Sequence, residues 1–377
     1  MESLSNIALK KLKNYIPVYD EQWKYTNINK FDKFNFTNTS KSSNLELSCN
    51  SLKHLSLNDA FNDNFNNCKN ILNQIIPSEK NKFILNNTAF FQSGNYFYLP
   101  KDVNQRNPIY IKNIIGENKS RSFLNDRILF HFGENSSATI VLNELNNSAA
   151  LSNIVYELYL EENSNIELII NSNKPQTTQI LNLGSIINRN ACLKIFSIDI
   201  SGKSIKNNYF IDLNKPNGQF YYYGINLLND SNCIDNYIEI NHNTKHTISN
   251  VNQKNILADK STGIFYSKST IQNNSYNSEA HQNNNNLILS ENALIHSNPQ
   301  LMIYNDDVQC SHGSTTGKID NDALFYLRSR GINFNEAKQI LLNAFLNDIV
   351  DNVKNNDVNL ELKNNINSWV NMYVNKK

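Results

Sequence analysis

The chain has 377 residues, enough to bury a large core arranged in two or three structural units. Lys and Arg together number 35 against 34 Asp and Glu, and this balance excludes a general electrostatic attraction to nucleic acid or to an anionic membrane. No apolar run approaches the roughly 20 residues of a membrane span, and "MESLSNIALKKLKNY" lacks the apolar stretch of a secretory signal. We therefore expect neither nucleic-acid nor membrane partners.

The cysteines argue for a reduced compartment. There are five of them, they are scattered, and none belongs to a CxxC pair. A disulfide framework or a structural zinc site would need closer and more regular spacing. The expected location is therefore the cytoplasm. The five positions are Cys49, Cys68, Cys192, Cys233 and Cys310.

Residues 1–88 are predicted to form an N-terminal helical region. In "NIALKKLKNYI", Leu9, Leu12 and Ile16 recur at spacings of three and four, as on one face of a helix. The stretch "DAFNDNFNNCKNILNQII" has the same spacing and predicts another short amphipathic helix. Its apolar positions are Phe61, Phe65, Cys68, Ile71, Leu72 and Ile75.

Residues 89–310 are predicted to form a β-helix core. Short segments rich in Ile, Val, Tyr and Phe, such as "SATIVLNEL" and "CLKIFSIDI", are bounded by Asn, Ser or Gly and indicate strands; "LILSENALIHS" is predicted as one more. Turn-like elements precede several of these strands, and their asparagines are separated by 28, 27, 27 and 26 residues. Such a period favours a solenoid, whereas a sandwich would show turns every ~8 to 12 residues without the longer repeat. The repeating asparagines are Asn135, Asn163, Asn190, Asn217 and Asn243.

Residues 311–377 are predicted to form a C-terminal helical domain. Asp320 is the expected N-cap of a helix over 321–331, and Gly331 the residue that ends it. Asn333, three residues before Glu336, predicts the start of a second helix over 335–352. A final amphipathic helix is expected to bury Leu362, Ile366, Trp369, Val370 and Tyr373.

Within the stretch "DDVQCSHGSTTGKIDNDALFYLRSRGI", the nine residues from Cys310 to Lys318 include a cysteine, a histidine, two glycines and a lysine. Its "GSTTGK" resembles a phosphate-binding loop, but three residues separate Gly313 from Gly317 where that motif has four, and Ile319 follows Lys318 where it has Ser or Thr. The segment is therefore expected to be a glycine-bearing turn between strand and helix, without ATP binding.

Cys310 and His312 lie two residues apart, so on an extended segment both side chains face the same side. The pair allows a Cys-His nucleophile with Asp306 or Asp307 as third partner, or two soft and borderline ligands for iron or zinc. From these residues alone, a buried cysteine beside a histidine satisfied by the backbone is favoured over a metal site. His242, His246, His281 and His296 are further conceivable ligands, although lone histidines in strands are more often packed or exposed.

The same stretch, with "NPQLMIYNDDVQCSHG" upstream and "EAKQILLNAF" after it, closely resembles the C-terminal signature of the SufD family in the SUF iron–sulfur cluster assembly system. Near the N-terminus "DEQWKYTNI" looks like that family's Glu-x-Trp-Lys-Tyr-Thr element, and "FGENSSATIVLNE" resembles a strand entry of the family. The related SufB usually has Glu-His-Glu where this chain has Ser311-His312-Gly313, so the resemblance favours SufD.

This resemblance implies a right-handed parallel β-helix flanked by helical regions, and a non-catalytic scaffold subunit. It implies pairing with a SufB-like subunit through the β-helix; whether the chain alone forms a homodimer stays open. It also implies that a SufC-like ATPase binds the C-terminal helices. The apolar stripe of the helix over 335–352 is the candidate contact, although it is equally suited to packing on the β-helix. The candidate SufC contacts are Ala337, Ile340, Leu341, Ala344 and Phe345.

The resemblance makes the cluster a transient cargo that forms near the SufB–SufD interface. His312 is then the stronger candidate for holding or orienting iron, and Cys310 the weaker one. Whether a flavin binds the assembled complex stays open. Two rival hypotheses are a stand-alone Cys-His enzyme and a carbohydrate-active β-helix. The latter expects paired carboxylates, in which the strand region is poor.

Overall fold

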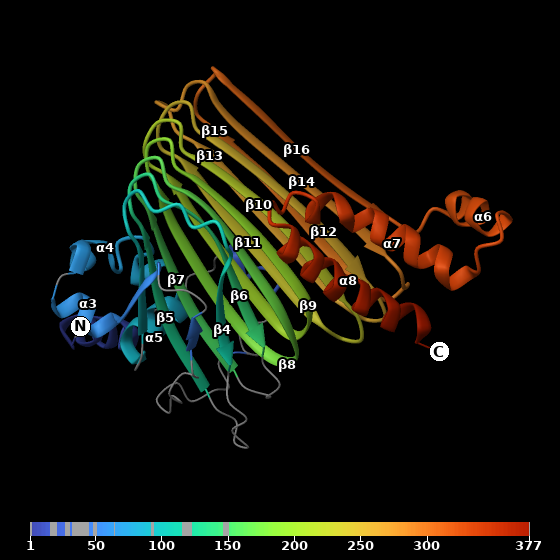
Figure 1. Ribbon diagram of the computed structural model, residues 1–377, viewed down its shortest axis with the longest axis horizontal. Helices are drawn as coiled ribbons and strands as arrows, with labels where there is room; N and C mark the ends of the chain where they lie inside the picture. The colour runs from blue at the N-terminus through green and yellow to red at the C-terminus, as the bar shows by residue number, and fades with distance from the viewer. Residues whose placement is uncertain are drawn as a thin grey trace.

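The computed structural model describes residues 2–15, 21–26, 31, 45–47, 51–63, 65–91, 94–114, 123–145 and 151–376. Its centre is a parallel β-solenoid of about seven turns, and helices lie toward both ends of the chain (Figure 1). The predicted fold class, a mainly β protein with a β-helix core and helical flanks, is confirmed.

Each turn of the solenoid contributes one strand to each of two sheets. The long strands β8 (Asn165–Ile187) and β9 (Cys192–Leu213) bend from one sheet into the other, so that the first part of β9 pairs with β10 and its last part with β11. Sheet 1 otherwise holds β4 (Ile109–Ile114), β6 (Ser137–Leu145), β10 (Gln219–Leu228), β12 (Ile248–Leu257), β14 (Ser278–Ile288) and β16 (Val308–Gly317). Sheet 2 otherwise holds β3 (Gly94–Leu99), β5 (Phe123–Phe132), β7 (Leu151–Leu160), β11 (Cys233–His242), β13 (Thr262–Ile271) and β15 (Leu294–Ile303).

A ladder of asparagines marks one corner of the solenoid. Asn135, Asn163, Asn190 and Asn217 have φ angles of 56°, 59°, 55° and 62°, a left-handed conformation that asparagine tolerates better than most residues. Their amides are hydrogen-bonded from coil to coil, with Nδ2 to Oδ1 distances of 3.0, 2.9 and 2.9 Å. The first four positions of the predicted repeat are therefore equivalent corners of successive coils.

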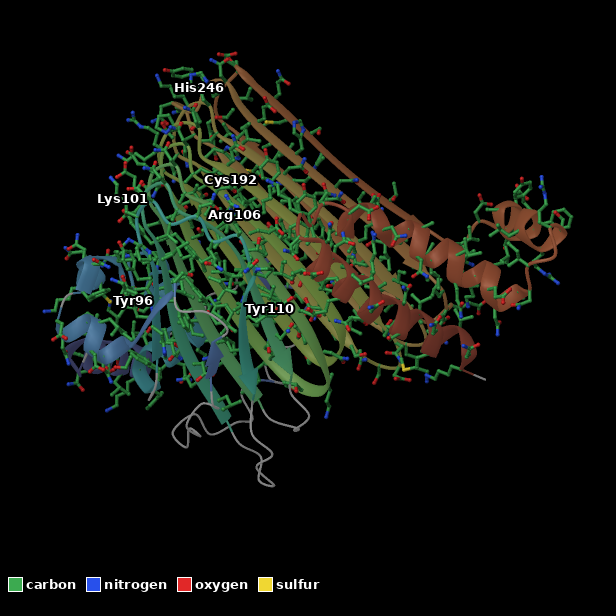
Figure 2. The ribbon with its side chains drawn as sticks, in the orientation of Figure 1. Tyr96, Lys101, Arg106, Tyr110, Cys192 and His246 are labelled. Atoms are coloured by element: carbon green, nitrogen blue, oxygen red, sulfur yellow. The ribbon has the colours of Figure 1, made fainter. Side chains whose placement is uncertain are left out.

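The fifth predicted position of the repeat is wrong. In the register of β10 and β12, Gln219 pairs with Ile248, a step of 29 residues, so His246 with φ 58° occupies the next corner. Asn243 instead donates to Asn214 at 2.7 Å in a neighbouring ladder. The coils lengthen after β10, and a constant period therefore misplaces the later corners. Figure 2 shows His246 on the same edge of the solenoid as Lys101.

The lumen of the solenoid is apolar through most coils and becomes polar toward the last ones. Inward side chains such as Leu193 and Phe220 stack in register and are fully buried. Farther along, Asn226, Asn255 and Asn286 follow one another on the luminal side, and Asn255 donates to Asn286 at 2.6 Å. Because these buried amides satisfy one another, the asparagine-rich coils pack without an apolar filling.

The N-terminal region covers the outer face of sheet 2. Its helices are α1 (Glu2–Lys13), α3 (Leu57–Asn62), α4 (Cys68–Ile71) and α5 (Lys82–Phe90), with 3-10 turns at Glu21–Trp23, Phe65–Asn67 and Ser78–Lys80. Two short strands, β1 (Leu45–Leu47) and β2 (Lys53–Ser56), pair antiparallel with β4 and β3. Ile76 packs directly on Gly184 of β8. A Cβ atom added to Gly184 would lie 2.0 Å from Cγ1 of Ile76, so this close contact requires glycine in the sheet.

The predicted helical faces of this region are partly confirmed. Leu9 and Leu12 pack beside Leu85 of α5, while Ile16 lies outside the described residues. The predicted helix over the Phe61 to Ile75 stretch is wrong as a single element. Asn66 and Asn67 adopt φ angles of 42° and 64°, which break it into α3, a 3-10 turn and α4. Asparagine's tolerance of this conformation outweighs the helical spacing of the apolar residues.

The C-terminal helices are α6 (Asn321–Ser329), α7 (Phe334–Val350) and α8 (Asn356–Asn375). The predicted caps are confirmed: Asp320 accepts from Asp322 N and Ala323 N, Asn333 accepts from Glu336 N, and Gly331 has φ 91°. Helices α7 and α8 lie across the outer face of sheet 1, whereas α6 projects away from the solenoid (Figure 1). As predicted, Leu362, Ile366, Trp369 and Val370 are buried in that contact, and Tyr373 packs at its margin.

Two strand predictions near the C-terminal end are corrected. The "GSTTGK" segment is no turn, because residues through Gly317 belong to β16, so the expected boundary at residue 310 falls inside a strand. β16 lacks the apolar pattern by which the other strands are predicted. Its luminal side faces no further coil and therefore needs no apolar residues. The predicted strand "LILSENALIHS" is interrupted, since β14 ends at Ile288 and β15 begins at Leu294.

Among the helices of the described ranges, none is both long enough and apolar enough to span a membrane.

Candidate functional site

The last coil of the solenoid ends in open strand edges. β16 pairs with β14 and β15 with β13, and no strand covers their outer edges within the part of the chain that the structure describes. Most residues of β16 are exposed, in contrast to the almost fully buried strands of the central coils. An open edge presents unpaired backbone donors and acceptors and is a ready template for pairing with another chain.

Cys310 and His312 lie on this terminal strand, on its luminal side. They pair in register with Ala280 and Gln282 of β14, whose side chains are buried in the lumen. Because side chains alternate along a strand, Cys310 and His312 stand directly above these residues at the open mouth of the solenoid. The structure thus brings the two together on one side of an exposed strand.

The hydrogen bond of His312 determines which of its ring nitrogens is available to a ligand. His312 Nδ1 lies 3.1 Å from the carbonyl oxygen of Pro299, which can only accept, so Nδ1 carries the proton and donates. In the neutral ring this leaves the lone pair on Nε2, the atom that would bind a metal. Burial raises the pKa of the Cys310 thiol, so a metal ion would have to displace its proton on binding.

The pair does not complete a site. Among the described residues, no group of three or more His, Cys, Asp or Glu side chains is placed to hold a metal ion. His312 hydrogen-bonds to Pro299, and within the described ranges neither Asp306 nor Asp307 hydrogen-bonds to it, so the arrangement lacks the third member that a Cys-His nucleophile needs.

The four other histidines considered as ligands from the sequence lie elsewhere. His242 is buried between Thr247 and Ser249, and His246 occupies the ladder corner. His281 contacts Ser311 on the outer side of sheet 1, and His296 stacks on Tyr25 with a centroid separation of 4.4 Å. None of them joins Cys310 and His312.

Two exposed apolar groups near the C-terminal end were not predicted. On β15 and just after it, Leu294, Ile303 and Tyr304 are 56%, 45% and 55% exposed. On α6 and α7, Phe325 and Phe334 are 73% and 49% exposed. A sequence alone gives no signal for them, because apolar residues at strand ends and on helices normally predict burial.

The candidate SufC contacts divide between two faces of α7. Ala337 is fully buried, and Phe345 packs toward the solenoid with the Lys254 ammonium 4.8 Å from its ring centroid. Leu341 is half-buried, whereas Ile340 and Ala344 are exposed. The buried stripe actually runs through Leu342, Leu346, Ile349 and Val350. Ile340 and Ala344 are therefore accessible to a partner, as is Phe325 on α6.

Comparison with known proteins agrees with this geometry. Residues 114–345 match the family model for the SufBD core domain of SUF system FeS cluster assembly. The match covers more than half of the chain, which therefore belongs to the SufBD family, and the matched residues include most of the solenoid. Within that class the chain is a SufD-type protein.

The relatives include two SufD proteins. The iron–sulfur cluster assembly protein SufD of Escherichia coli is 32% identical over 40% of this chain and 36% of its own length. The SufD of Bacillus subtilis is 24% identical over 73% of this chain and 64% of its own length. An iron–sulfur cluster assembly SufBD family protein of Synechocystis sp. is 24% identical over 71% of this chain and 61% of its own length. The chain thus spans less than two thirds of each relative's length.

Proposed function

We propose that this chain is a non-catalytic scaffold subunit of the SUF iron–sulfur cluster assembly system. In this proposal it pairs with a SufB-like subunit at the open end of the solenoid and binds a SufC-like ATPase through its C-terminal helices. The nascent cluster is cargo built at the first of these contacts, and a flavin held by the assembled complex remains a further expectation. The observation that carries the proposal is the incomplete ligand pair Cys310–His312 on an exposed edge strand.

Pairing at the open end is supported by what the last coil leaves uncovered. β15 and β16 expose backbone edges, and Leu294, Ile303 and Tyr304 add apolar surface beside them. A second solenoid placed there would cover these edges and supply ligands beyond the thiol and the imidazole. The same edges suit a second copy of this chain, so a homodimer is the alternative occupant when the SufB-like subunit is absent.

Binding of the ATPase is supported by the helices that extend from the sheet. Helix α6 has no buried residue, and Phe325 on α6 and Ile340 on α7 are both exposed apolar residues. Lys254 of β12 donates to Asp348 and to the Phe345 carbonyl, both at 2.6 Å, and so fastens the opposite side of α7 to the solenoid. A nucleotide-driven movement of the ATPase would therefore reach the coils through a rigid attachment.

The test is co-expression with the SufB-like and SufC-like partners, followed by purification and measurement of bound iron and sulfide. His312→Ala is expected to keep the complex but lose most of the cluster, and Cys310→Ala to lose less. His281→Ala, on the outward side of β14, is the matched control. Normal cluster yield with His312→Ala would remove this residue from the mechanism. No association with either partner would undo the proposal itself.

A second pair of variants separates the two contacts. Ile340→Asp on the exposed side of α7 is expected to release the ATPase while pairing with the SufB-like subunit persists. Leu360→Asp is the control, because Leu360 is 60% exposed but lies on α8. If both variants retain the ATPase equally, the contact lies on another face.

A further inference from the structure

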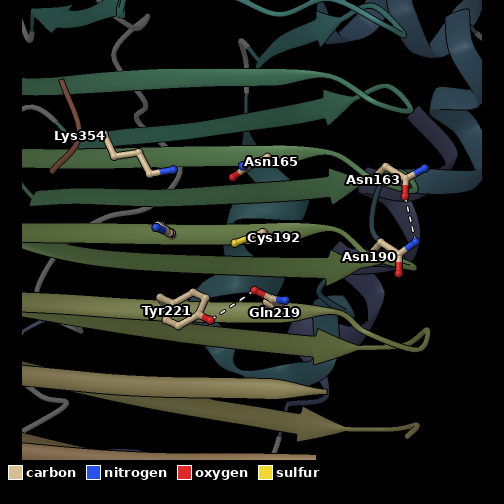
Figure 3. A pocket seen from close by; sticks show the side chains of 8 residues that line it. Asn163, Asn165, Asn190, Cys192, Gln219, Tyr221 and Lys354 are labelled. Carbon is tan, nitrogen blue, oxygen red and sulfur yellow. Dashed lines mark hydrogen bonds between the residues drawn. The ribbon is translucent and has the colours of Figure 1, made fainter. Parts of the chain in front are cut away.

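A pocket of about 400 Å³ opens on the outer face of sheet 1, away from Cys310 and His312. Three successive coils contribute to it through Asn165 of β8, Cys192 and Lys194 of β9, and Gln219 and Tyr221 of β10. The connection between α7 and α8 adds Lys354 (Figure 3). The pocket therefore lies where the solenoid meets the C-terminal helices.

The strand register explains why these side chains converge. Asn165, Cys192 and Gln219 occupy one row across the three coils, and Lys194 and Tyr221 stand side by side in the row two residues farther on. All five point outward from the sheet, since the intervening residues, such as Leu193 and Ile195, fill the lumen. Figure 3 shows the Lys354 side chain reaching across the outer surface toward Asn165.

Two ammonium groups face this pocket, and the carboxylate of Glu167, which pairs in register with Lys194, interacts electrostatically with both but offsets only one of the two charges. The Lys194 ammonium lies 5.6 Å from the centroid of the Tyr221 ring. Within the part of the chain that the structure describes, neither Lys194 nor Lys354 forms a salt bridge within 4.0 Å. Elsewhere on this protein, lysines such as Lys254 and Lys376 do find carboxylates. The two pocket lysines therefore leave positive charge to be neutralised.

One buried carboxylate sets the position of Lys354. Glu167 of β8 accepts a hydrogen bond from the Lys354 backbone N–H and is 6% exposed. It thereby fixes the connection between α7 and α8 against the sheet and provides a single negative charge against two positive ones. Cys192 adds no charge, because burial raises the pKa of its thiol and keeps it protonated at neutral pH.

We propose that this pocket binds a phosphate-type oxyanion between the ammonium groups of Lys194 and Lys354, with the side-chain amides of Asn165 and Gln219 as further donors. The Tyr221 hydroxyl donates to Gln219 Oε1 at 3.3 Å and so orients that amide. Such an anion accepts several hydrogen bonds at once and gains most from charge-assisted ones. Since Lys194 belongs to the solenoid and Lys354 to the helical connection, the bound anion ties the two parts together. This inference does not depend on the proposed role in cluster assembly.

The binding test uses the full-length chain in a buffer without phosphate, at constant ionic strength. Isothermal titration is done with inorganic phosphate and, in a second arm, with glycerol 3-phosphate. Binding of either supports the site, and the two arms tell whether it accepts free phosphate or a phosphate ester. Lys194→Gln combined with Lys354→Gln is expected to weaken binding at least tenfold. Lys10→Gln combined with Lys260→Gln, which removes two exposed lysines elsewhere, is expected to leave it unchanged.

A second measurement locates the anion. Phosphate is expected to slow alkylation of Cys192 by iodoacetamide several-fold, as followed on the Cys192 peptide by mass spectrometry, while chloride at equal ionic strength does not. Cys192→Ser is expected to bind phosphate within twofold of the unmodified chain, because the thiol is a wall of the pocket rather than a ligand. The proposal is overturned if neither anion binds, or if the pocket and control lysine variants bind equally. Loss of binding with Cys192→Ser would also overturn it.

Discussion

Asn190 donates from Nδ2 to Oδ1 of Asn163 at 2.9 Å, although 27 residues separate the two. Both residues hold left-handed backbone angles, with φ of 55° and 59°. One side chain thus performs two tasks at each corner, because it tolerates the turn and it connects adjacent coils. The ladder is therefore a mechanical spine along one edge of the solenoid.

Replacing Asn163 with alanine is expected to lower the free energy of unfolding by about 1 to 2 kcal/mol. The change removes the side-chain amide hydrogen bonds that Asn163 forms with the neighbouring coils. It also places alanine in the left-handed backbone region, where it lacks the polar side chain that lets asparagine tolerate this conformation. Asn163→Gly keeps the backbone conformation accessible and is expected to cost less. Urea unfolding of the two variants measures the difference; equal losses would mean that the backbone conformation contributes nothing.

The first corners of this spine could be predicted from the sequence, since the spacing of Asn135, Asn163 and Asn190 directly reports the length of a coil. The later ones could not, because the coil length is set by turns whose residues vary. His246 takes a corner that asparagine occupies elsewhere, and nothing local distinguishes it from the other histidines. The pairing register of the strands across the whole solenoid, rather than the local turn propensity of a residue, decides which residue occupies each corner.

The candidate site shows the same division. The two-residue spacing of Cys310 and His312 was enough to place them on one side of an extended segment. Their location at the open mouth depends on β16 being the last strand of sheet 1, a property of the whole fold. The exposure of Ile340 and the burial of Ala337 likewise depend on which side of α7 meets the sheet. The pocket beside Cys192 is formed by three coils in register and by the connection between α7 and α8, so no local sequence motif predicts it.

Stability is expected to fall as the pH drops from 7 to 5 because of His242. Burial lowers the pKa of this imidazole to about 3 from its ordinary value of 6.5. Below pH 6.5 the unfolded chain therefore binds a proton that the folded chain does not, and unfolding becomes easier. The loss attributable to this residue is about 2 kcal/mol between pH 7 and pH 5.

Urea unfolding at pH 7 and pH 5 checks this contribution. The quantity compared between variants is the change in unfolding free energy with pH, not the free energy at one pH. His242→Gln is expected to remove most of the pH dependence, even if it lowers stability at pH 7 by disturbing the bonds to Thr247 and Ser249. His54→Gln, which changes an exposed histidine on β2, serves as the control. An unchanged slope in the His242 variant would show that other groups carry the acid sensitivity.

Lys254 is expected to control how firmly α7 is held on the solenoid. Its side chain is 9% exposed and donates to both Asp348 and the Phe345 carbonyl, so Lys254→Met keeps the apolar stem but removes two charge-assisted bonds. Hydrogen exchange is expected to accelerate in α7, by roughly tenfold for about 1.4 kcal/mol lost, with little change in β10. Equal protection of α7 in the variant would show that apolar packing alone holds the helix.

The ion pair of Arg127 and Glu157 is buried, and breaking it is expected to cost far more stability than breaking an exposed ion pair. The two side chains are 1% and 0% exposed, and Arg127 Nε donates to Glu157 at 2.9 Å while its Nη1 donates to Thr88 of α5 at 2.7 Å. The backbone N–H of Asn73 supplies a further donor to the carboxylate at 2.8 Å. The pair thus joins the outer face of sheet 2 to the N-terminal region that covers it.

Arg127→Met is expected to cost about 3 to 5 kcal/mol, because Glu157 would keep a buried charge without its partner. Adding Glu157→Gln removes that charge and is expected to restore part of the loss, a non-additivity that only contacting residues produce. The exposed pair Lys101–Glu134, at 2.6 Å, is the control, and Lys101→Met is expected to change stability by less than about 1 kcal/mol. Urea unfolding of Arg127→Met, Glu157→Gln, the double variant and Lys101→Met measures these differences. If Arg127→Met were as mild as Lys101→Met, the N-terminal region would have to be held on sheet 2 by its apolar contacts alone.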